Sequence, residues 1–147
     1  MSRYAAMIAA ALILVAADED NDKSAKEALK KLEGTWSMVS GEEEGKEIQE
    51  ETIKSARLVI KGTRHTVKVG DDTFVGTHAV DPSKKPKAIH SKDTSGRFKD
   101  KTILGIYEIE GDELKVCFAP PDKERPTEFT TKSGTGTILH VWKRQKE

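Results

Sequence analysis

The chain has 147 residues, enough for one domain, and its hydrophobic and charged residues make up nearly equal shares, 35% and 34%. Lys and Arg together number 25, and so do Asp and Glu, which gives a formal net charge of zero. A neutral chain has no net field that would attract it to nucleic acid or to an acidic membrane surface. We therefore expect no nucleic-acid partner.

The first 17 residues have the layout of a secretory signal peptide. Arg3 precedes an uncharged apolar stretch, residues 5–17, that ends with small side chains at Val15 and Ala17. This stretch is shorter than the roughly 20 residues that a membrane-spanning helix needs. We predict that residues 1–17 are removed and that the mature protein is secreted or periplasmic, with no membrane segment. The alternative is that this segment is retained as an anchor.

The rest of the chain divides into a charged linker, residues 18–23, which we expect to be mobile, and a single domain, residues 24–147. Ser24 and Glu27 form a capping-box pattern, which predicts a short helix over residues 25–32.

Beyond residue 35 the hydrophobic pattern changes to alternation, which is typical of β-strands. Many short strands, one short helix and closely spaced turns predict an all-β fold, either an antiparallel barrel or a sandwich. We expect a lipocalin-like barrel of about eight strands, because closure removes exposed strand edges. The predicted strands cover residues 35–39, 57–61, 65–69, 73–80, 88–91, 101–110, 113–119, 127–131 and 137–144.

Two of the predicted strands form a hairpin around a Gly-Asp turn. With Asp71 and Asp72 as the turn residues, Val69 pairs with Phe74, and His65 pairs with His78. One face of the hairpin is then largely apolar, and we expect it to point inward. That face carries His65, Val67, Val69, Phe74, His78 and Val80.

A second hairpin is predicted around Gly111 and Asp112, with Tyr107 opposite Val116. Its other face carries Leu104, Ile106 and Cys117, so these strands are apolar on both sides. Either the N-terminal helix or a similar element covers that outer face, or the face is a contact surface.

Cys117 is the only cysteine, so the chain cannot form an internal disulfide. A free thiol in an exported protein is safest when buried, and Cys117 lies in an apolar run that can bury it. The alternation places this side chain opposite the interior, and no base can be assigned to it, so we do not expect it to be a nucleophile.

The segment Leu32-Glu-Gly-Thr-Trp36, which leads from the helix into the first strand, is similar to the Gly-x-Trp motif of lipocalins. In that family the tryptophan closes one end of the barrel, and a basic residue of the last strand packs over it. The resemblance therefore implies that Gly34 and Trp36 form the motif. It offers Lys143 or Arg144 as the covering residue, of which we favour Arg144.

A closer resemblance extends from about Leu32 to Lys143. The segments Asp81–Pro86, Leu104–Glu108 and Cys117–Phe129, together with the motif around Trp36, resemble an uncharacterised lipocalin-like family abundant in planctomycete bacteria. The resemblance implies the fold, a bacterial origin and frequent export. It implies no established activity.

The candidate ligand-contact residues are the side chains expected to line the barrel interior. His65 and His78 are the sharpest feature, because cross-strand partners have Cβ atoms about 5 Å apart. Two histidines are too few for a typical zinc site, which has three or four protein ligands, so we predict no metal and no cofactor. The candidate lining residues are His65, Val67, Phe74, His78, Tyr107, Val116, Phe118 and His140.

We predict a binding module that holds a small apolar molecule in its interior. The alternative is a structural or protein-interaction domain with a filled core, which would meet its partner through the outer face or the proline-rich segment 120–126. No catalytic set of residues can be assigned, so we do not expect an enzyme. The size of the interior cavity distinguishes the first two, since ligand pockets usually measure about 300 Å³ or more.

Overall fold

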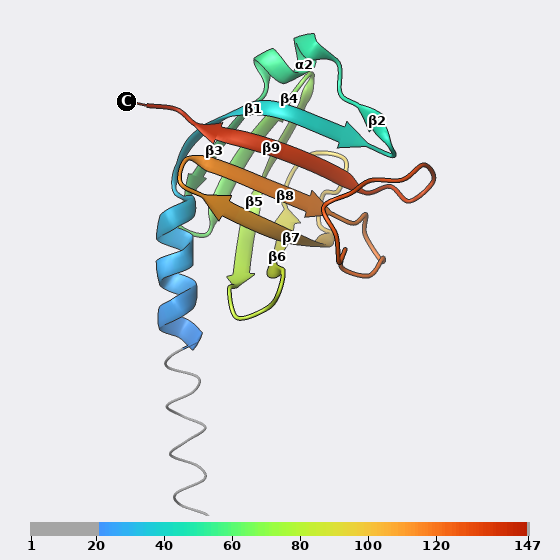
Figure 1. Ribbon diagram of the computed structural model, residues 1–147. Coiled ribbons are helices and arrows are strands. Elements are labelled where there is room, and N and C mark those ends of the chain that lie inside the picture. The colour runs from blue at the N-terminus through green and yellow to red at the C-terminus, as the bar shows by residue number, and fades with distance from the viewer. Residues whose placement is uncertain (1–20, 147) are drawn as a thin grey trace, which may run out of the picture.

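The computed structural model describes residues 21–146, and the predicted signal peptide, residues 1–17, lies outside the described residues. Figure 1 shows a sheet that curves back on itself, with the N-terminal helix extending from one end. The strands are β1 (Gly34–Glu43), β2 (Lys46–Glu47), β3 (Arg57–Lys61), β4 (Arg64–Val69), β5 (Asp72–Asp81), β6 (Lys87–Asp93), β7 (Thr102–Glu110), β8 (Glu113–Phe118) and β9 (Ile138–Arg144), and a short helix, α2 (Glu50–Ser55), precedes β3.

Every strand is antiparallel to its neighbours, and the order is β2-β1-β3-β4-β5-β6-β7-β8-β9. Strand β1 also pairs with β9, which closes an eight-stranded barrel with the two-residue β2 as a side branch. Closure leaves no long strand edge open to solvent. The predicted all-β barrel is confirmed.

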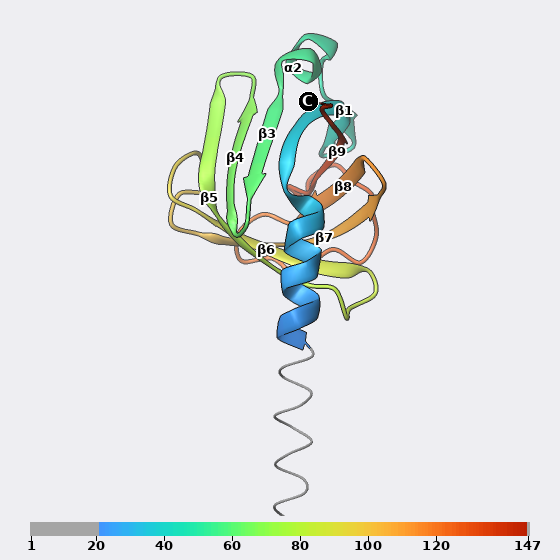
Figure 2. The ribbon, with the colours of Figure 1, turned by 90° about the vertical axis from the view of Figure 1, so that its left-hand side faces the viewer.

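Residues 21–32 form the N-terminal helix, which therefore includes residues 21–23 of the predicted mobile linker. It lies at the opposite end of the barrel from α2, as Figure 2 shows. The helix α2 was not predicted; Ile48 before it and Ile53 within it pack against the core. Among the described residues, no helix combines the length and apolarity that a membrane crossing requires.

The first hairpin differs from the predicted register by two residues. Val69 pairs with Asp72, Val67 with Phe74 and His65 with Gly76. Gly70 takes a φ of 61° and occupies the first turn position, where a tight two-residue turn needs a positive φ. Because side chains alternate with a period of two, this shift leaves the same residues on the inner face.

The second hairpin has the predicted register, with Tyr107 opposite Val116 and Gly105 opposite Phe118. Of the two alternatives for its outer face, a covering element or a contact surface, the structure shows a cover, which comes from the segment around Phe129 and Thr130 and not from the N-terminal helix. Phe129 of that segment packs against a buried cluster of Ile106, Cys117 and Leu139.

The predicted strand over residues 127–131 is absent, and this stretch is irregular. Pro126 directly precedes it, and proline lacks the N–H group that a sheet ladder uses. The segment is instead fastened by Arg125, whose guanidinium donates to the carbonyls of Ile89 and Gly105, at 2.5 and 2.6 Å. The segment therefore connects β8 and β9 and lies against the barrel wall, and Arg125 is hydrogen-bonded within the protein.

One end of the barrel is closed by Trp36, which is fully buried and donates from Nε1 to the Leu32 carbonyl at 3.0 Å. The guanidinium of Arg144 lies 4.3 Å from the centre of the Trp36 ring and donates to the carbonyls of Lys31 and Glu33. A Cβ at Gly34 would lie 3.0 Å from that guanidinium, so glycine leaves room for it. The structure thus brings together the three residues of the predicted motif.

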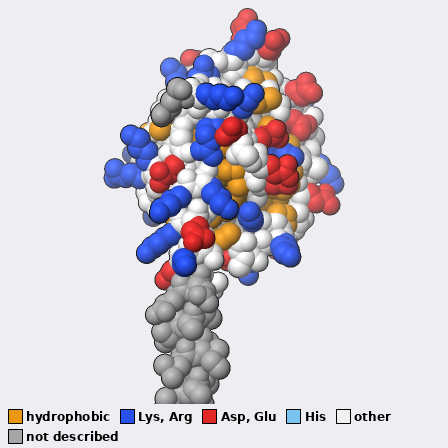
Figure 3. All heavy atoms as spheres, turned by 60° about the vertical axis from the view of Figure 1, so that its left-hand side comes forward, with side chains coloured by type: hydrophobic (Ala, Val, Ile, Leu, Met, Phe, Trp, Pro, Cys, Tyr) orange, Lys and Arg blue, Asp and Glu red, His pale blue; other side chains and the backbone are white. Residues whose placement is uncertain are grey.

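The outer surface carries charges of both signs. On the face shown in Figure 3, the Lys and Arg side chains are interspersed with Asp and Glu side chains. Such a mixture fits the zero net charge of the sequence and gives this face no extended field of one sign.

Candidate functional site

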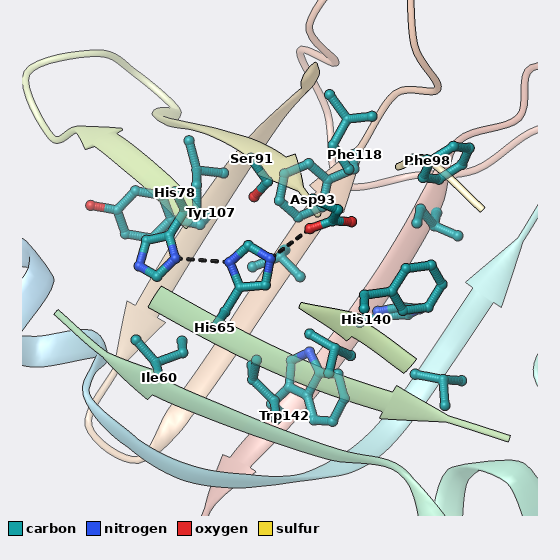
Figure 4. A pocket seen from close by; sticks show the side chains of 18 of the residues that line it. Ile60, His65, His78, Ser91, Asp93, Phe98, Tyr107, Phe118, His140 and Trp142 are labelled. Atoms are coloured by element: carbon teal, nitrogen blue, oxygen red, sulfur yellow. Dashed lines mark hydrogen bonds and ion pairs between the residues drawn. The ribbon is translucent and has the colours of Figure 1, made fainter. Parts of the chain in front are cut away.

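The interior of the barrel contains a cavity of about 110 Å³. All eight residues predicted to line the interior do line this cavity, which Figure 4 shows from close by. Apolar side chains such as Ile60, Leu114 and Trp142 form most of the remaining wall. Sequence reasoning missed the polar lining residues Ser91, Asp93 and Arg97.

A chain of three buried polar side chains crosses the cavity wall from β5 through β4 to β6. His65 Nδ1 lies 3.0 Å from His78 Nδ1, and His65 Nε2 lies 2.7 Å from Asp93 Oδ1. The three residues are 8%, 6% and 5% exposed, in the order His65, His78, Asp93. Both short contacts are drawn in Figure 4. The histidines meet diagonally, because the observed register places His65 opposite Gly76.

His78 stays neutral in this environment. Burial, together with a smaller effect of the neighbouring His65, lowers its pKa from 6.5 to about 4, while a hydrogen bond with the Gly62 backbone acts in the opposite direction. A neutral imidazole has one N–H and one bare nitrogen. The hydrogen bond at one nitrogen therefore decides whether the other nitrogen is a donor or an acceptor.

Among the described residues, three buried side-chain atoms make no hydrogen bond: His78 Nε2, the Tyr107 hydroxyl and His140 Nε2. All three belong to residues that line the cavity. Burial, with a smaller contribution from Asp81, raises the pKa of Tyr107 to about 12, so this hydroxyl keeps its proton. Buried polar atoms without partners are costly and uncommon in folded proteins. The three unpartnered atoms thus belong to residues around one cavity whose other walls are mostly apolar.

The cavity meets solvent beside an ion pair. Arg97 and Glu43 contact at 3.2 Å, both side chains are partly exposed, and both line the cavity. The Arg97 guanidinium also lies 5.0 Å from the centre of the Phe98 ring. Burial, with a smaller effect of Arg97, lowers the pKa of nearby His140 to about 4. The rim thus carries an ion pair, and the ring of His140 nearby is neutral.

Cys117 lies outside the cavity, in the covered outer cluster, and is fully buried. Burial raises the pKa of its thiol to about 11, and Sγ donates to the Thr130 carbonyl at 3.6 Å. Because the thiolate is the reactive form, the group is poorly suited to act as a nucleophile.

We predict that the native Cys117 thiol reacts with Ellman's reagent at least about 100-fold more slowly than the same thiol in the guanidinium-unfolded chain, because the thiolate is scarce and enclosed. Replacing Phe129 with alanine should raise the native rate by opening the cover, while the Val39→Ala exchange on an exposed strand position should not. Equal native and unfolded rates would contradict this burial.

The residues described form no cluster of three His, Cys, Asp or Glu side chains that is arranged to hold a metal ion. The fold and the site define a class: a closed antiparallel barrel with a small, mostly apolar interior and a few unpartnered polar atoms. Searches with family models, among curated proteins and among solved structures find no match to this chain.

Proposed function

We propose that this protein is an exported binding module that holds a small, mostly apolar molecule inside its barrel. The observation that carries the proposal is the interior cavity of about 110 Å³, open to solvent at one rim, around which three buried polar atoms lack partners. Apolar walls supply affinity, and a few placed polar groups orient the guest. Export is supported by the signal-like residues 1–17, and the lipocalin-like assignment by the motif around Trp36.

The cavity volume limits the size of the guest. The volume falls short of the roughly 300 Å³ that we expected of a ligand pocket, and it is too small for drug-sized ligands, which occupy about 300–1,000 Å³. An engineered cavity of about 150 Å³ binds benzene. This cavity is smaller, so we propose a guest of about six non-hydrogen atoms.

The alternative, an interaction domain with a filled core, has less support. A filled core predicts no interior cavity. Of the two surfaces that would meet a partner, the outer apolar face is covered by Phe129 and its segment, and the proline-rich segment 120–126 is bonded to the barrel wall through Arg125.

The proposal is tested by titrating the purified protein, labelled with ¹⁵N, with cyclohexanol and following its amide resonances. We expect saturable shifts concentrated at the cavity-lining residues. Replacing Val67, which lines the cavity, with phenylalanine should fill the space and abolish binding. The matched control, Val75→Phe, places the same ring on an exposed position of the neighbouring strand and should leave binding intact. Shifts that are equal in both variants would contradict an interior site.

A further inference from the structure

The contacts of His65 determine which ring nitrogens of His65 and His78 carry a hydrogen. A carboxylate oxygen only accepts hydrogen bonds, so the 2.7 Å contact with Asp93 places a hydrogen on His65 Nε2. The 3.0 Å contact between the two Nδ1 atoms holds one hydrogen between them. When His65 is neutral, its only hydrogen is on Nε2, so the bridging hydrogen belongs to His78. His78 Nε2 is then bare.

From this geometry we propose that, in the form in which His65 carries a single ring hydrogen, Asp93 holds His78 through His65 in the tautomer whose Nε2 is a bare acceptor, and that the cavity in that form selects guests carrying a hydroxyl group. Such a group donates to the bare nitrogen, whereas a carbonyl of the same size does not. This inference rests on the proposed binding function and names the chemical class of its ligand.

The position of the bare nitrogen supports a role in binding. His78 is 6% exposed and lines the cavity, yet Nε2 makes no hydrogen bond. In Figure 4 this nitrogen points away from His65, toward the side of the view where the Tyr107 hydroxyl lies. That hydroxyl is also without a partner. An alcohol suits the pair, because its oxygen accepts a hydrogen bond while its hydrogen is donated.

The tautomer is read directly by ¹⁵N NMR of the histidine side chains in the intact wild-type protein at pH 7.5. We expect His78 to show a bare, pyridine-type Nε2 and a protonated Nδ1, and His65 to show the opposite pattern. A protonated, pyrrole-type Nε2 on His78 would overturn the proposal, because the ring would then be a donor. This reading requires no variant and no ligand.

Ligand selection is tested with cyclohexanol and cyclohexanone, which share ring and size but differ in the donor. We expect the wild-type protein to bind cyclohexanol about tenfold more tightly, the value of one hydrogen bond. His78→Leu should remove this preference by weakening the alcohol alone. Tyr107→Phe should weaken both ligands alike, because both accept from its hydroxyl. His90→Leu, at an exposed position of β6, is the control.

The outcomes separate the two proposals. Equal affinities of the wild-type protein for the two ligands would overturn the selection of hydroxyl groups while leaving a small-molecule site in place. Binding of neither ligand would overturn the proposed function, and the selection with it. A preference that persists unchanged in His78→Leu would also overturn the inference, because another group would then be responsible.

Discussion

Replacing Trp36 with alanine is expected to lower the free energy of unfolding by about 3–5 kcal/mol, as large-to-small changes at buried aromatic positions do. The side chain is fully buried at the closed end of the barrel. The change also removes the hydrogen bond from Nε1 to the Leu32 carbonyl and the ring beneath Arg144. Since domains are stable by only about 5–15 kcal/mol, this single change should bring the fold close to its limit.

Urea unfolding followed by far-ultraviolet circular dichroism measures the loss. Val39→Ala is the matched control, because Val39 lies on the same strand and is 55% exposed. We expect that control to change the free energy of unfolding by less than about 0.5 kcal/mol. If Trp36→Ala costs no more than the control, the closed end does not hold the barrel together.

The barrel is expected to lose stability as the pH falls from about 6.5 to about 4. Burial lowers the pKa of both His78 and His140 from 6.5 to about 4 in the folded protein. In this window the unfolded chain binds protons at these rings and the folded chain does not, so the free energy of unfolding falls with falling pH. Above pH 6.5 the effect is absent. For His140 alone the loss amounts to about 3 kcal/mol at the acid limit.

Urea unfolding at a series of pH values between about 7 and 4.5 measures this dependence. His140→Phe keeps a ring in contact with Trp142 but removes the titrating group, so its stability should fall less steeply. His90→Gln, an exchange at an exposed position, should follow the wild-type curve. Identical curves for His140→Phe and the wild type would show that His140 is not buried as a neutral ring.

Much of the fold follows from alternation and turn residues alone. The strand Arg57–Lys61 has the predicted bounds, and the second hairpin has the predicted register. The first hairpin was two residues out of register because Gly70, Asp71 and Asp72 allow two placements of a short turn. The positive φ at Gly70 places Gly70 and Asp71 in the turn. A register shift of two residues keeps each side chain on the same face, so the alternation of the sequence does not reveal it.

The residues that line the interior were predicted more fully than the hydrogen-bonded row of His78, His65 and Asp93 in its wall. Alternation placed His65 and His78 on one inner face and brought His140 to the same cavity. It did not find Asp93, because that residue ends a strand that we had predicted to stop at residue 91. The cover over Cys117 was also missed, because an irregular, proline-containing segment has no periodicity to read.

The most direct test of the central claim, that the interior holds a small molecule, is native mass spectrometry of the protein purified from the host that encodes it. We predict a retained guest of roughly 100 Da, the size that a cavity near that of a benzene site can hold. The guest should be lost from the Val67→Phe variant and kept by Val75→Phe. Protein that repeatedly carries no guest, or whose guest is unaffected by filling the cavity, would contradict the account.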